Sequence, residues 1–535
     1  MRDLHIEGFA DERWNPIVRG IDLSLKRGEV LGLIGESGAG KSTLGLAAMG
    51  YAKPGCRITQ GTIIFDGMDL TKATEDQRRD LRGSRIAYVA QSAAASFNPA
   101  HRLIDQTIET ALRHNVASKD DATKSAIDLY RRLQLPNADQ IGFRYPHQVS
   151  GGQLQRAMTA MAMECRPDLI IFDEPTTALD VTTQVEVLAA IRNIVEQFQT
   201  AAIYITHDLA VVAQMADRIM VLRHGRLVEE ADTRTMLTAP TQDYTKSLWA
   251  VRSLANDGRP ETQPILTVKN VTASYGGLVT VLDDVSVPVP KGRTVAVVGE
   301  SGSGKSTLAR VITGLLPPIS GEIVFEGKAL PRRLKDRDKD TLRRIQMIYQ
   351  MPDTALNPRQ TVRDVIGRPL EFYHGVSGRD RDRRVGELLR LIELDDRYID
   401  RLPSELSGGQ KQRICIARAL AAQPDLVICD EVTSALDQIV QEEILKLLMR
   451  LQQELGITYI FITHDIATVR AIADHVVVMY KGKVVEQGPK VEVLSPPHPP
   501  YTQLLLSSVP EMDPDWLTRL LADRAKTGGM SAAGN

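Results

Sequence analysis

Short, continuous runs of apolar residues recur along the chain, each four to six residues long. They cover residues 29–34, 169–172 and 202–206 in the first half of the chain and 294–298, 426–429 and 458–463 in the second. Runs of this kind favour parallel β-strands that are buried on both faces of a sheet. The pattern therefore predicts an α/β fold with a parallel sheet in each half of the chain.

Three further kinds of segment accompany the apolar runs in both halves: strands of alternating polarity, glycine-bounded hairpins and stretches of helical periodicity. In chain order they cover residues 4–9, 61–67 and 105–135, and then 266–271, 321–327 and 362–394. Each half is therefore expected to add an antiparallel β subdomain and a helical subdomain to its parallel-sheet core.

The two halves repeat the same motifs at nearly constant spacing. Lys41 and Lys305, each in a glycine-rich loop, are 264 positions apart (305 − 41). Ser150 and Ser407, each opening an SGGQ segment, are 257 apart (407 − 150), and the acidic pairs and histidines downstream keep that offset. Independent motifs would not hold a common offset, so we infer a tandem duplication of one domain. We expect a first domain at residues 1–255, a polar linker at 256–264, a second domain at 265–510 and a tail at 511–535.

Each half contains a GxxxxGK[ST] loop between an apolar run and a helix-forming segment, GESGAGKST and GESGSGKST. This strand–loop–helix context is that of a P-loop, which binds a nucleoside triphosphate. The glycines let backbone N–H groups surround an anion, and the following helix adds its positive end. The lysines are expected to reach the β- and γ-phosphates, and the serine hydroxyls that follow them to face Mg²⁺. The expected ATP-binding residues of the loops are Gly35, Glu36, Ser37, Gly38, Ala39, Gly40, Lys41, Ser42, Thr43, Gly299, Glu300, Ser301, Gly302, Ser303, Gly304, Lys305, Ser306 and Thr307.

Two acidic residues end an apolar run in each half, in the segments DLIIFDE and DLVICDE. The first carboxylate of each pair, Asp173 or Asp430, can hold Mg²⁺. The second can orient and deprotonate an attacking water, as phosphoryl transfer to water requires. A histidine follows the next apolar run, where a γ-phosphate needs a nearby donor. The expected catalytic residues are Glu174, Glu431, His207 and His464.

Charge and cysteine content restrict the partners. Lys and Arg number 65 against 67 Asp and Glu, a formal net charge of −2, so nothing demands a polyanion and no nucleic-acid partner is expected. No run of about 18 apolar residues occurs, so no membrane span is expected. The four cysteines lack CxxC spacing, so neither a zinc nor an iron–sulfur centre is expected. These features predict a cytoplasmic protein.

The SGGQ segments identify the family that the chain resembles. VSGGQ at 149–153 and LSGGQ at 406–410 resemble the signature of ABC ATPases, and the chain looks like two nucleotide-binding domains of that family joined head to tail. The resemblance covers nearly all of the chain and implies an ATPase that uses ATP and Mg²⁺. The signature residues that it implies in ATP binding are Ser150, Gly151, Gly152, Gln153, Ser407, Gly408, Gly409 and Gln410.

The resemblance also assigns residues outside the loops and signatures. Gln91 and Gln350 are similar to the Q-loop glutamines that sense Mg²⁺, and both are expected to bind ATP. Tyr275 is placed to stack on adenine in the second half, while Phe9 and Trp14 compete for that role in the first. The implied metal-site residues are Ser42, Gln91, Asp173, Ser306, Gln350 and Asp430.

In the resembled family the two domains close face to face, so that each nucleotide touches both halves. The first P-loop would then receive Ser407 and Gly409 from the second half, and the second P-loop would receive Ser150 and Gly152 from the first. One departure is Val432, where the family usually has the proline that would fix φ after the catalytic glutamate. Two competent sites are still expected.

The ends of the two halves point to one subfamily. Residues 239–245 and 495–502 resemble the ending of oligopeptide/dipeptide importer subunits. This resemblance implies an ATPase on the cytoplasmic face of the inner membrane, paired with two membrane-spanning permease subunits and indirectly with a solute-binding protein. A soluble twin ATPase acting on ribosomes is the alternative, and it predicts a long charged helix between the halves. A DNA-maintenance ATPase predicts a long coiled coil or zinc cysteines, and the sequence has neither.

The segments after the Q-loop glutamines, 92–99 and 351–358, are expected to meet the permease subunits. In ABC transporters this region forms a groove for a short cytoplasmic helix of the membrane partner. Each segment has an apolar residue before Asn-Pro, Phe97 or Leu356, and we expect both side chains to be exposed in such a groove.

Overall fold

The computed structural model describes residues 1–10, 12–176, 179–250, 259, 262–277, 279–434 and 436–526. They form two compact units, which are described separately: Met1–Ala250 with the chain from Pro510 onward, called the first half below, and Val251–Val509, called the second half. Of the expected linker, residues 256–258, 260 and 261 lie outside the described part, as do residues 527–535 of the expected tail. The limits of the linker and tail stay predictions.

The parallel sheet of the first half places the P-loop strand at its centre. Its strand order is β11-β10-β3-β9-β8-β7, and only β11 runs antiparallel to its neighbour. The strands are β3 (Val30–Ile34), β7 (Ile86–Val89), β8 (Leu169–Asp173), β9 (Ala201–Ile205), β10 (Arg218–Arg223) and β11 (Arg226–Asp232). Every residue of β3, β8 and β9 is buried, as their continuous apolar runs predict.

The second half repeats this sheet strand for strand, in the order β17-β18-β19-β14-β20-β21. Its strands are β14 (Thr294–Val298), β17 (Ile345–Ile348), β18 (Leu426–Asp430), β19 (Thr458–Ile462), β20 (His475–Tyr480) and β21 (Lys483–Pro489). The P-loop strand β14 again lies between two parallel neighbours. The predicted parallel sheet in each half is confirmed.

An antiparallel sheet accompanies each parallel one, also as predicted. In the first half the order is β2-β1-β4, with a separate β5–β6 hairpin, and in the second half it is β13-β12-β15-β16. The strands are β1 (Arg2–Ala10), β2 (Arg13–Ile21), β4 (Cys56–Thr62), β5 (Ile64–Phe65), β6 (Met68–Asp69), β12 (Pro264–Tyr275), β13 (Val279–Pro290), β15 (Ser320–Phe325) and β16 (Lys328–Ala329). Leu4 and Ile6 of β1 share one hydrophobic core with Leu31 and Leu33 of β3, which ties the two sheets together.

Helices complete both halves. Those of the first half are α1 (Lys41–Ala47), α2 (Glu75–Leu81), α3 (Ala93–Ser96), α4 (Leu103–Arg113), α5 (Lys119–Arg132), α6 (Ala138–Ile141), α7 (Gly151–Met163), α8 (Val181–Phe198), α9 (Leu209–Met215), α10 (Thr233–Thr238), α11 (Asp243–Ala250) and α22 (Trp516–Lys526). Those of the second half are α12 (Lys305–Ile312), α13 (Lys339–Arg344), α14 (Pro352–Ala355), α15 (Val362–His374), α16 (Gly378–Leu391), α17 (Gly408–Leu420), α18 (Gln438–Leu455), α19 (Ile466–Ile472), α20 (Lys490–Val493) and α21 (Pro500–Ser507).

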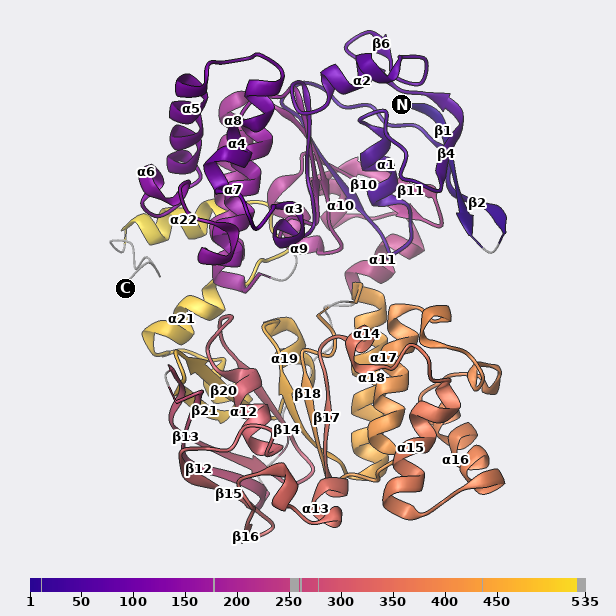
Figure 1. Ribbon diagram of the computed structural model, residues 1–535, viewed down its shortest axis with the longest axis vertical. Helices are drawn as coiled ribbons and strands as arrows, with labels where there is room; N and C mark the ends of the chain where they lie inside the picture. Colours follow the sequence, from indigo (N-terminus) through magenta and orange to yellow (C-terminus); the bar gives the residue numbers. More distant parts are fainter. Residues whose placement is uncertain are drawn as a thin grey trace. The chain divides into compact units, whose positions relative to one another are not determined.

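The two predicted helical stretches are α4–α5 and α15–α16. In the second half, α15 and α16 lie beyond α17 and α18, on the side away from β14 (Figure 1). Within the part of the chain that the structure describes, no helix is both long and apolar enough to cross a membrane.

The end of the chain returns to the first half. Trp516 and Leu517 of α22 are buried, and the Gln214 side chain of α9 donates to the carbonyls of Glu511 and Asp513 at 2.8 and 2.9 Å. The same amide accepts a hydrogen bond from the Leu517 N–H at 3.1 Å. The chain therefore leaves the first half once and rejoins it at Pro510, so the two halves are covalently connected twice.

Candidate nucleotide sites

Each P-loop adopts a conformation that only glycine supports at its first position. Gly35 has a φ of 146°, and a Cβ there would lie 2.1 Å from the Leu222 carbonyl oxygen. Gly299 repeats this geometry, with a Cβ 2.1 Å from the Met479 carbonyl oxygen. The close passage of each loop over the neighbouring strand is therefore fixed by glycine.

The P-loop lysines fold back over their own loops. Lys41 Nζ donates to the carbonyls of Gly35 and Glu36 at 2.7 and 2.9 Å. Lys305 Nζ does the same to those of Gly299 and Glu300, both at 2.7 Å. Both lysines are largely buried, so these bonds hold each ammonium at the centre of its loop. A bound phosphate would replace the carbonyls as their partner.

The hydroxyl after each lysine meets the predicted metal carboxylate. Ser42 Oγ donates to Asp173 Oδ1 at 2.9 Å, and Ser306 Oγ donates to Asp430 Oδ1 at 3.0 Å. The serine hydroxyl and the aspartate carboxylate both offer hard oxygen ligands. Mg²⁺ in such sites takes one or two protein oxygens, together with the nucleotide phosphates and water. The residues present fit Mg²⁺, which Ser42 and Asp173 would hold in the first half and Ser306 and Asp430 in the second. Burial raises the pKa of Asp430, although its hydrogen bond with Ser306 opposes the rise.

A tyrosine distinguishes the two metal carboxylates. Tyr88 on β7 donates from its hydroxyl to Asp173 Oδ2 at 2.5 Å. Tyr88 pairs with Ile171 across the sheet, and Met347 pairs with Ile428 in the same register, so Met347 is the second-half counterpart of Tyr88. Asp430 has no corresponding tyrosine there. Aligning the two copies at the Q-loop offset would have revealed this difference from the sequence.

The predicted base, the Q-loop glutamine and the histidine converge in both halves. Glu174 accepts from Gln91 Nε2 at 2.8 Å and lies 3.1 Å from His207 Nδ1. In the second half the corresponding distances are 2.6 Å from Gln350 and 3.6 Å from His464. The structure thus brings together three residues per half that span 116 positions of the sequence in the first half (207 − 91) and 114 in the second (464 − 350).

Both glutamates have the same backbone conformation. Glu174 and Glu431 each have a φ of 50°, and their N–H groups donate to the Ile205 and Ile462 carbonyls at 2.9 and 3.0 Å. A left-handed φ is uncommon outside glycine and is often found at functional positions. The backbone at Glu431, a predicted catalytic residue, therefore has the same conformation before Val432 as that at Glu174 has before Pro175.

The glutamates control the charge of the histidines. Burial alone would lower the pKa of His207 and of His464, but the adjoining carboxylate raises the pKa of each above its ordinary value. Burial would likewise raise the pKa of Glu431, but contact with His464 lowers it. In each pair the adjoining carboxylate therefore favours the protonated form of the histidine.

Replacing Glu431 with glutamine is expected to lower the pKa of His464, because the amide removes the carboxylate charge while the ring stays buried. A histidine with a raised pKa stabilises the fold below its unfolded pKa of about 6.5, and this stability is lost as pH rises through the folded pKa. The loss of thermal stability should therefore be larger at about pH 6 than at about pH 8.5. Histidine NMR titration measures the shift, with the exposed Glu454→Gln as the control. An unchanged His464 pKa would contradict the pairing.

The signature segments begin two helices with exposed N-termini. Ser150 caps α7, where its hydroxyl accepts from the Gln153 N–H at 3.3 Å, and Ser407 caps α17 in the same way with Gln410. Ser150 and Ser407 are exposed in their own halves. Helix N-termini of this kind can bind a phosphate. That the N-termini of α7 and α17 each reach the P-loop of the other half stays a prediction.

The two halves differ at the predicted adenine position. The Tyr275 hydroxyl accepts from Arg310 Nη1 at 3.0 Å, which places its ring beside the helix that follows the P-loop. Tyr275 pairs with Val279 in its sheet, and the same register in the first half pairs Gly8 with Asn15. The first-half counterpart of Tyr275 is therefore a glycine, so neither of the residues predicted to compete for this role occupies that position.

Those two aromatic residues pack on each other instead. The rings of Phe9 and Trp14 are 5.3 Å apart, and the Arg57 guanidinium lies 4.0 Å above the Trp14 ring. Both side chains are at least 40% exposed, so they remain accessible to a ligand. The identity of the first-half adenine contact stays a prediction.

The expectation that Phe97 and Leu356 are exposed is wrong. Each is only 3% exposed and belongs to the interior of its own half. Each follows a single helical turn, α3 or α14, and turns inward where the chain leaves that turn. Leu356 belongs to the core cluster that α15 and α17 build. The exposed apolar residue of the second-half segment is Met351, which is 54% exposed.

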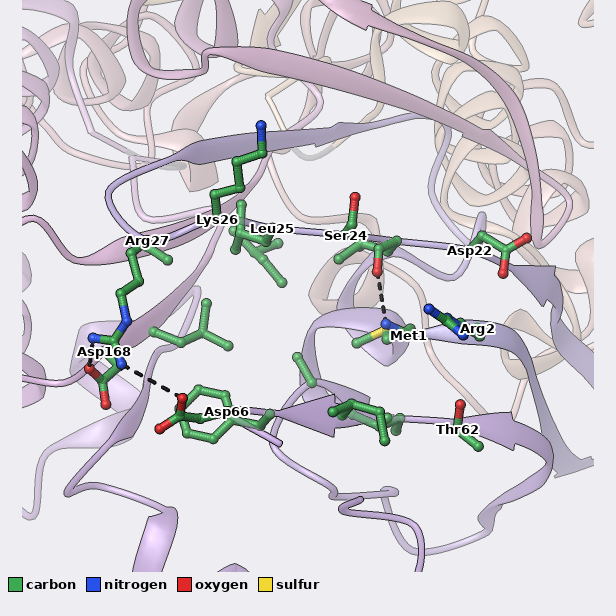
Figure 2. Close-up of a pocket in the computed structure, with 18 of the residues that line it drawn as sticks. Met1, Arg2, Asp22, Ser24, Leu25, Lys26, Arg27, Thr62, Asp66 and Asp168 are labelled. Atoms are coloured by element: carbon green, nitrogen blue, oxygen red, sulfur yellow. Dashed lines mark hydrogen bonds and ion pairs between the residues drawn. The ribbon is translucent and has the colours of Figure 1, made fainter. Parts of the chain in front are cut away.

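A cavity of about 970 Å³ in the first half lies apart from the nucleotide residues. Its walls come from the N-terminus, the loop before β3, the β5 strand and the starts of β8 and β9 (Figure 2). Arg27 donates to Asp168 at 2.7 Å on one side, and the Met1 amine donates to the Leu23 carbonyl at 2.8 Å on the other. No residue predicted to bind ATP lines this cavity as the structure describes it.

Comparison with known proteins matches the chain to two family models. The ABC transporter model matches residues 18–177 and 282–434, and the model of the oligopeptide/dipeptide transporter C-terminal region matches residues 485–530. The ATP-binding module is therefore present twice, as the repeated motifs predicted.

Named relatives match over most of their length. The chain is 37% identical to the glutathione import ATP-binding protein GsiA of Shigella dysenteriae, over 96% of this chain and 90% of the relative. The protein of the same name from Salmonella choleraesuis is 38% identical over 93% of this chain and 87% of the relative, and that from Escherichia coli K12 is 37% identical over 96% and 90%. With these matches and the geometry of both P-loops, the chain belongs to the ABC transporter family, as an ATPase with two fused ATP-binding domains.

Proposed function

We propose that the chain is the ATP-hydrolysing subunit that energises a peptide-type ABC importer. The observation that carries the proposal is the match of residues 485–530 to the oligopeptide/dipeptide transporter C-terminal region, in a chain that contains the ATP-binding domain twice. The names of the relatives support the same direction of transport, because they are glutathione import proteins. The proposed cargo is a small peptide or a peptide-like solute.

The residues of each half divide the reaction between them. The lysine exchanges its loop carbonyls for phosphate oxygens, and the serine and aspartate hold Mg²⁺, which supplies charge neutralisation at the phosphates when bound. Glu174 in the first half and Glu431 in the second orient a water and accept its proton. Gln91 and Gln350 hold these carboxylates in place by donating a hydrogen bond to them. We propose that the signature helix of the opposite half completes each site, so that ATP binding closes the halves and hydrolysis releases them.

The proposed partners are two membrane-spanning permease subunits and, through them, a solute-binding protein. The chain would lie on the cytoplasmic face of the inner membrane. Met351 marks the docking region in the second half, because it directly follows the Q-loop glutamine that contacts Glu431. Movement of that glutamine on hydrolysis would thus reach the permease within one residue.

Met351→Asp is expected to abolish most co-purification with the permease subunits while leaving ATP affinity within about twofold, because the charge disrupts an apolar contact outside the P-loop. Met351 is the N-cap of α14, a position that aspartate suits, so the local fold should survive. The measurement is the yield of the chain with tagged permease subunits encoded by neighbouring reading frames.

Val491→Asp is the matched control, because Val491 is a similarly exposed apolar residue, 60% exposed, on α20. Equal loss in both variants would mean that general surface charge, not the docking region, is responsible. If the unmodified chain purifies with ribosomes and without permease subunits, the importer proposal fails.

A further inference from the structure

Residues 495–507, called the second-half tail below and distinct from residues 511–535, reach the P-loop of their own half through one tyrosine. Tyr501 lies in the first turn of α21, and its hydroxyl accepts a hydrogen bond from the Glu300 N–H at 2.9 Å. Its ring packs on that of Tyr480 at the end of β20, with centroids 4.2 Å apart. Thr502 and Leu505 of the same helix are buried, which fixes α21 against its own half. Tyr501 therefore connects the region matched by the oligopeptide/dipeptide model with the phosphate loop.

This hydrogen bond holds one residue of the loop from both sides. The Glu300 carbonyl accepts from Lys305 Nζ at 2.7 Å, while the Glu300 N–H is held by Tyr501. Lys305 must release the Glu300 carbonyl to bind a phosphate. After that release, the hydrogen bond from the Glu300 N–H to Tyr501 still holds Glu300 in place. With the tail bound, the loop keeps its shape when the lysine changes partner.

The first half repeats the arrangement with a different contact. Tyr244, at the same place in α11, is 257 positions before Tyr501 (501 − 244), as the duplication requires. Its hydroxyl is buried beside Glu36 but makes no hydrogen bond of normal geometry within the described residues. Arg223 replaces Tyr480: its guanidinium lies 4.4 Å above the Tyr244 ring and 4.0 Å from the Glu36 carboxylate. The first-half tail therefore reaches the corresponding loop residue, Glu36, but without the well-aligned backbone hydrogen bond that Tyr501 makes.

The first-half tail is anchored elsewhere. Glu229 of β11 accepts from the Thr241 N–H at 2.7 Å and from the Thr241 hydroxyl at 2.8 Å. Burial would raise the pKa of Glu229, but the adjacent Thr245 hydroxyl and the hydrogen bonds with Thr241 and Gln242 lower it to about 2. The Glu229 carboxylate therefore stays charged near neutral pH, and it anchors the first-half tail at a place separate from the P-loop.

We propose that Tyr501 is a positioning residue for the second P-loop, which tightens ATP binding there by fixing the Glu300 peptide, and that Tyr244 has no comparable effect on the first. The proposal rests on the proposed function only in assuming that both P-loops bind ATP. It gives the tail of this subfamily a role in the nucleotide site itself and makes the two sites unequal.

The test compares Tyr501→Phe with Tyr244→Phe in the full chain. Tyr501→Phe keeps the ring but removes the acceptor oxygen, so the Kd for ATP at the site of Lys305 should rise roughly two- to tenfold, the effect of one hydrogen bond. Tyr244→Phe should change the Kd at the site of Lys41 by less than about twofold. Photoreactive ATP at a series of concentrations, with labelled peptides assigned to each half, measures both sites separately.

Tyr480→Phe is the control, because it removes a phenol oxygen from the same ring pair without touching the loop. A merely structural role for Tyr501 would lower the melting temperature and leave the site-resolved Kd within twofold, and that result overturns the proposal. Equal effects of Tyr501→Phe and Tyr244→Phe also overturn it. Absence of ATP labelling at both loops in the unmodified chain would instead refute ATP binding itself, so the two failures are distinct.

Discussion

Replacing Glu174 and Glu431 together with glutamine is expected to lower ATP turnover by roughly 10²- to 10⁴-fold, the range that a positioned general base contributes. Glutamine has nearly the same shape, but its neutral amide cannot accept the proton of the attacking water. The hydrogen bonds described for the P-loop lysines go to loop carbonyls, and those of the Ser42 and Ser306 hydroxyls go to aspartates, so ATP binding should persist. Steady-state phosphate release and equilibrium ATP binding measure the two quantities.

The single variants separate the two sites. Because Glu174 and Glu431 have the same φ and the same backbone hydrogen bond, each single change should disable its own site to a similar degree. Glu454→Gln, on an exposed helical face, controls for loss of one charge. A double variant with half or more of the parent turnover would place the general base elsewhere.

The parts of the site that the sequence predicts are those in which chemistry and backbone conformation depend on the same few residues. Gly35 must be glycine because another strand passes within 2.1 Å of where its Cβ would be, and the same motif supplies Lys41. Ser42 and Asp173 are far apart in sequence, but Ser42 opens the helix that follows the loop after β3, and Asp173 ends β8 of the same parallel sheet. The carboxyl ends of such strands lie at one edge, so their meeting follows from the fold class.

Contacts that depend on side-chain direction could not be predicted in this way. Phe97 and Leu356 have no periodic pattern around them, because each lies just after a single helical turn, and only the packing of the core decides that they point inward. Strand pairing makes Gly8 the counterpart of Tyr275, an offset of 267 positions (275 − 8). The P-loop lysines are 264 positions apart, so the two offsets differ by three residues, and no local motif reveals this difference.

The differences between the halves surround a common centre. Lysine, serine, aspartate and glutamate are the same in both, whereas Tyr88 and Met347, Gly8 and Tyr275, and Arg223 and Tyr480 differ at positions outside this set. A duplicated site retains the residues that bond to phosphate and metal and can change those that only position them. The two sites are therefore expected to be competent but unequal in affinity.

Gly408→Asp is expected to lower nucleotide trapping at the site of Lys41 by roughly 10- to 100-fold, and Gly151→Asp to do so at the site of Lys305. This range corresponds to about 1.4 to 2.8 kcal/mol of repulsion between the added carboxylate and the nucleotide phosphates. Both glycines are the first residues of their signature helices. Aspartate stabilises a helix at that position, so the half that carries it should remain folded. Its carboxylate would nevertheless repel the phosphate that the helix N-terminus is proposed to receive.

The choice of glycine matters to this experiment. A Cβ at Gly408 or Gly151 has its nearest neighbour 3.7 or 3.9 Å away, which is ordinary contact. A Cβ at the next glycine, Gly409 or Gly152, would lie 2.5 Å from Val440 or 2.1 Å from Thr183, so a substitution there would disturb its own half whatever the arrangement of the two. Gly408→Ala and Gly151→Ala are the controls, because they add the Cβ without the charge.

Site-resolved trapping of a photoreactive ATP analogue with vanadate distinguishes the possible arrangements. Loss at the P-loop of the opposite half, with the alanine controls near the parent level, means that each nucleotide needs donors from both halves. Loss at the P-loop of the same half would refute the head-to-tail closure. The reason is geometric: within one half the signature serine is used to cap its own helix and faces outward, so a charge added there can reach only what approaches that surface from outside.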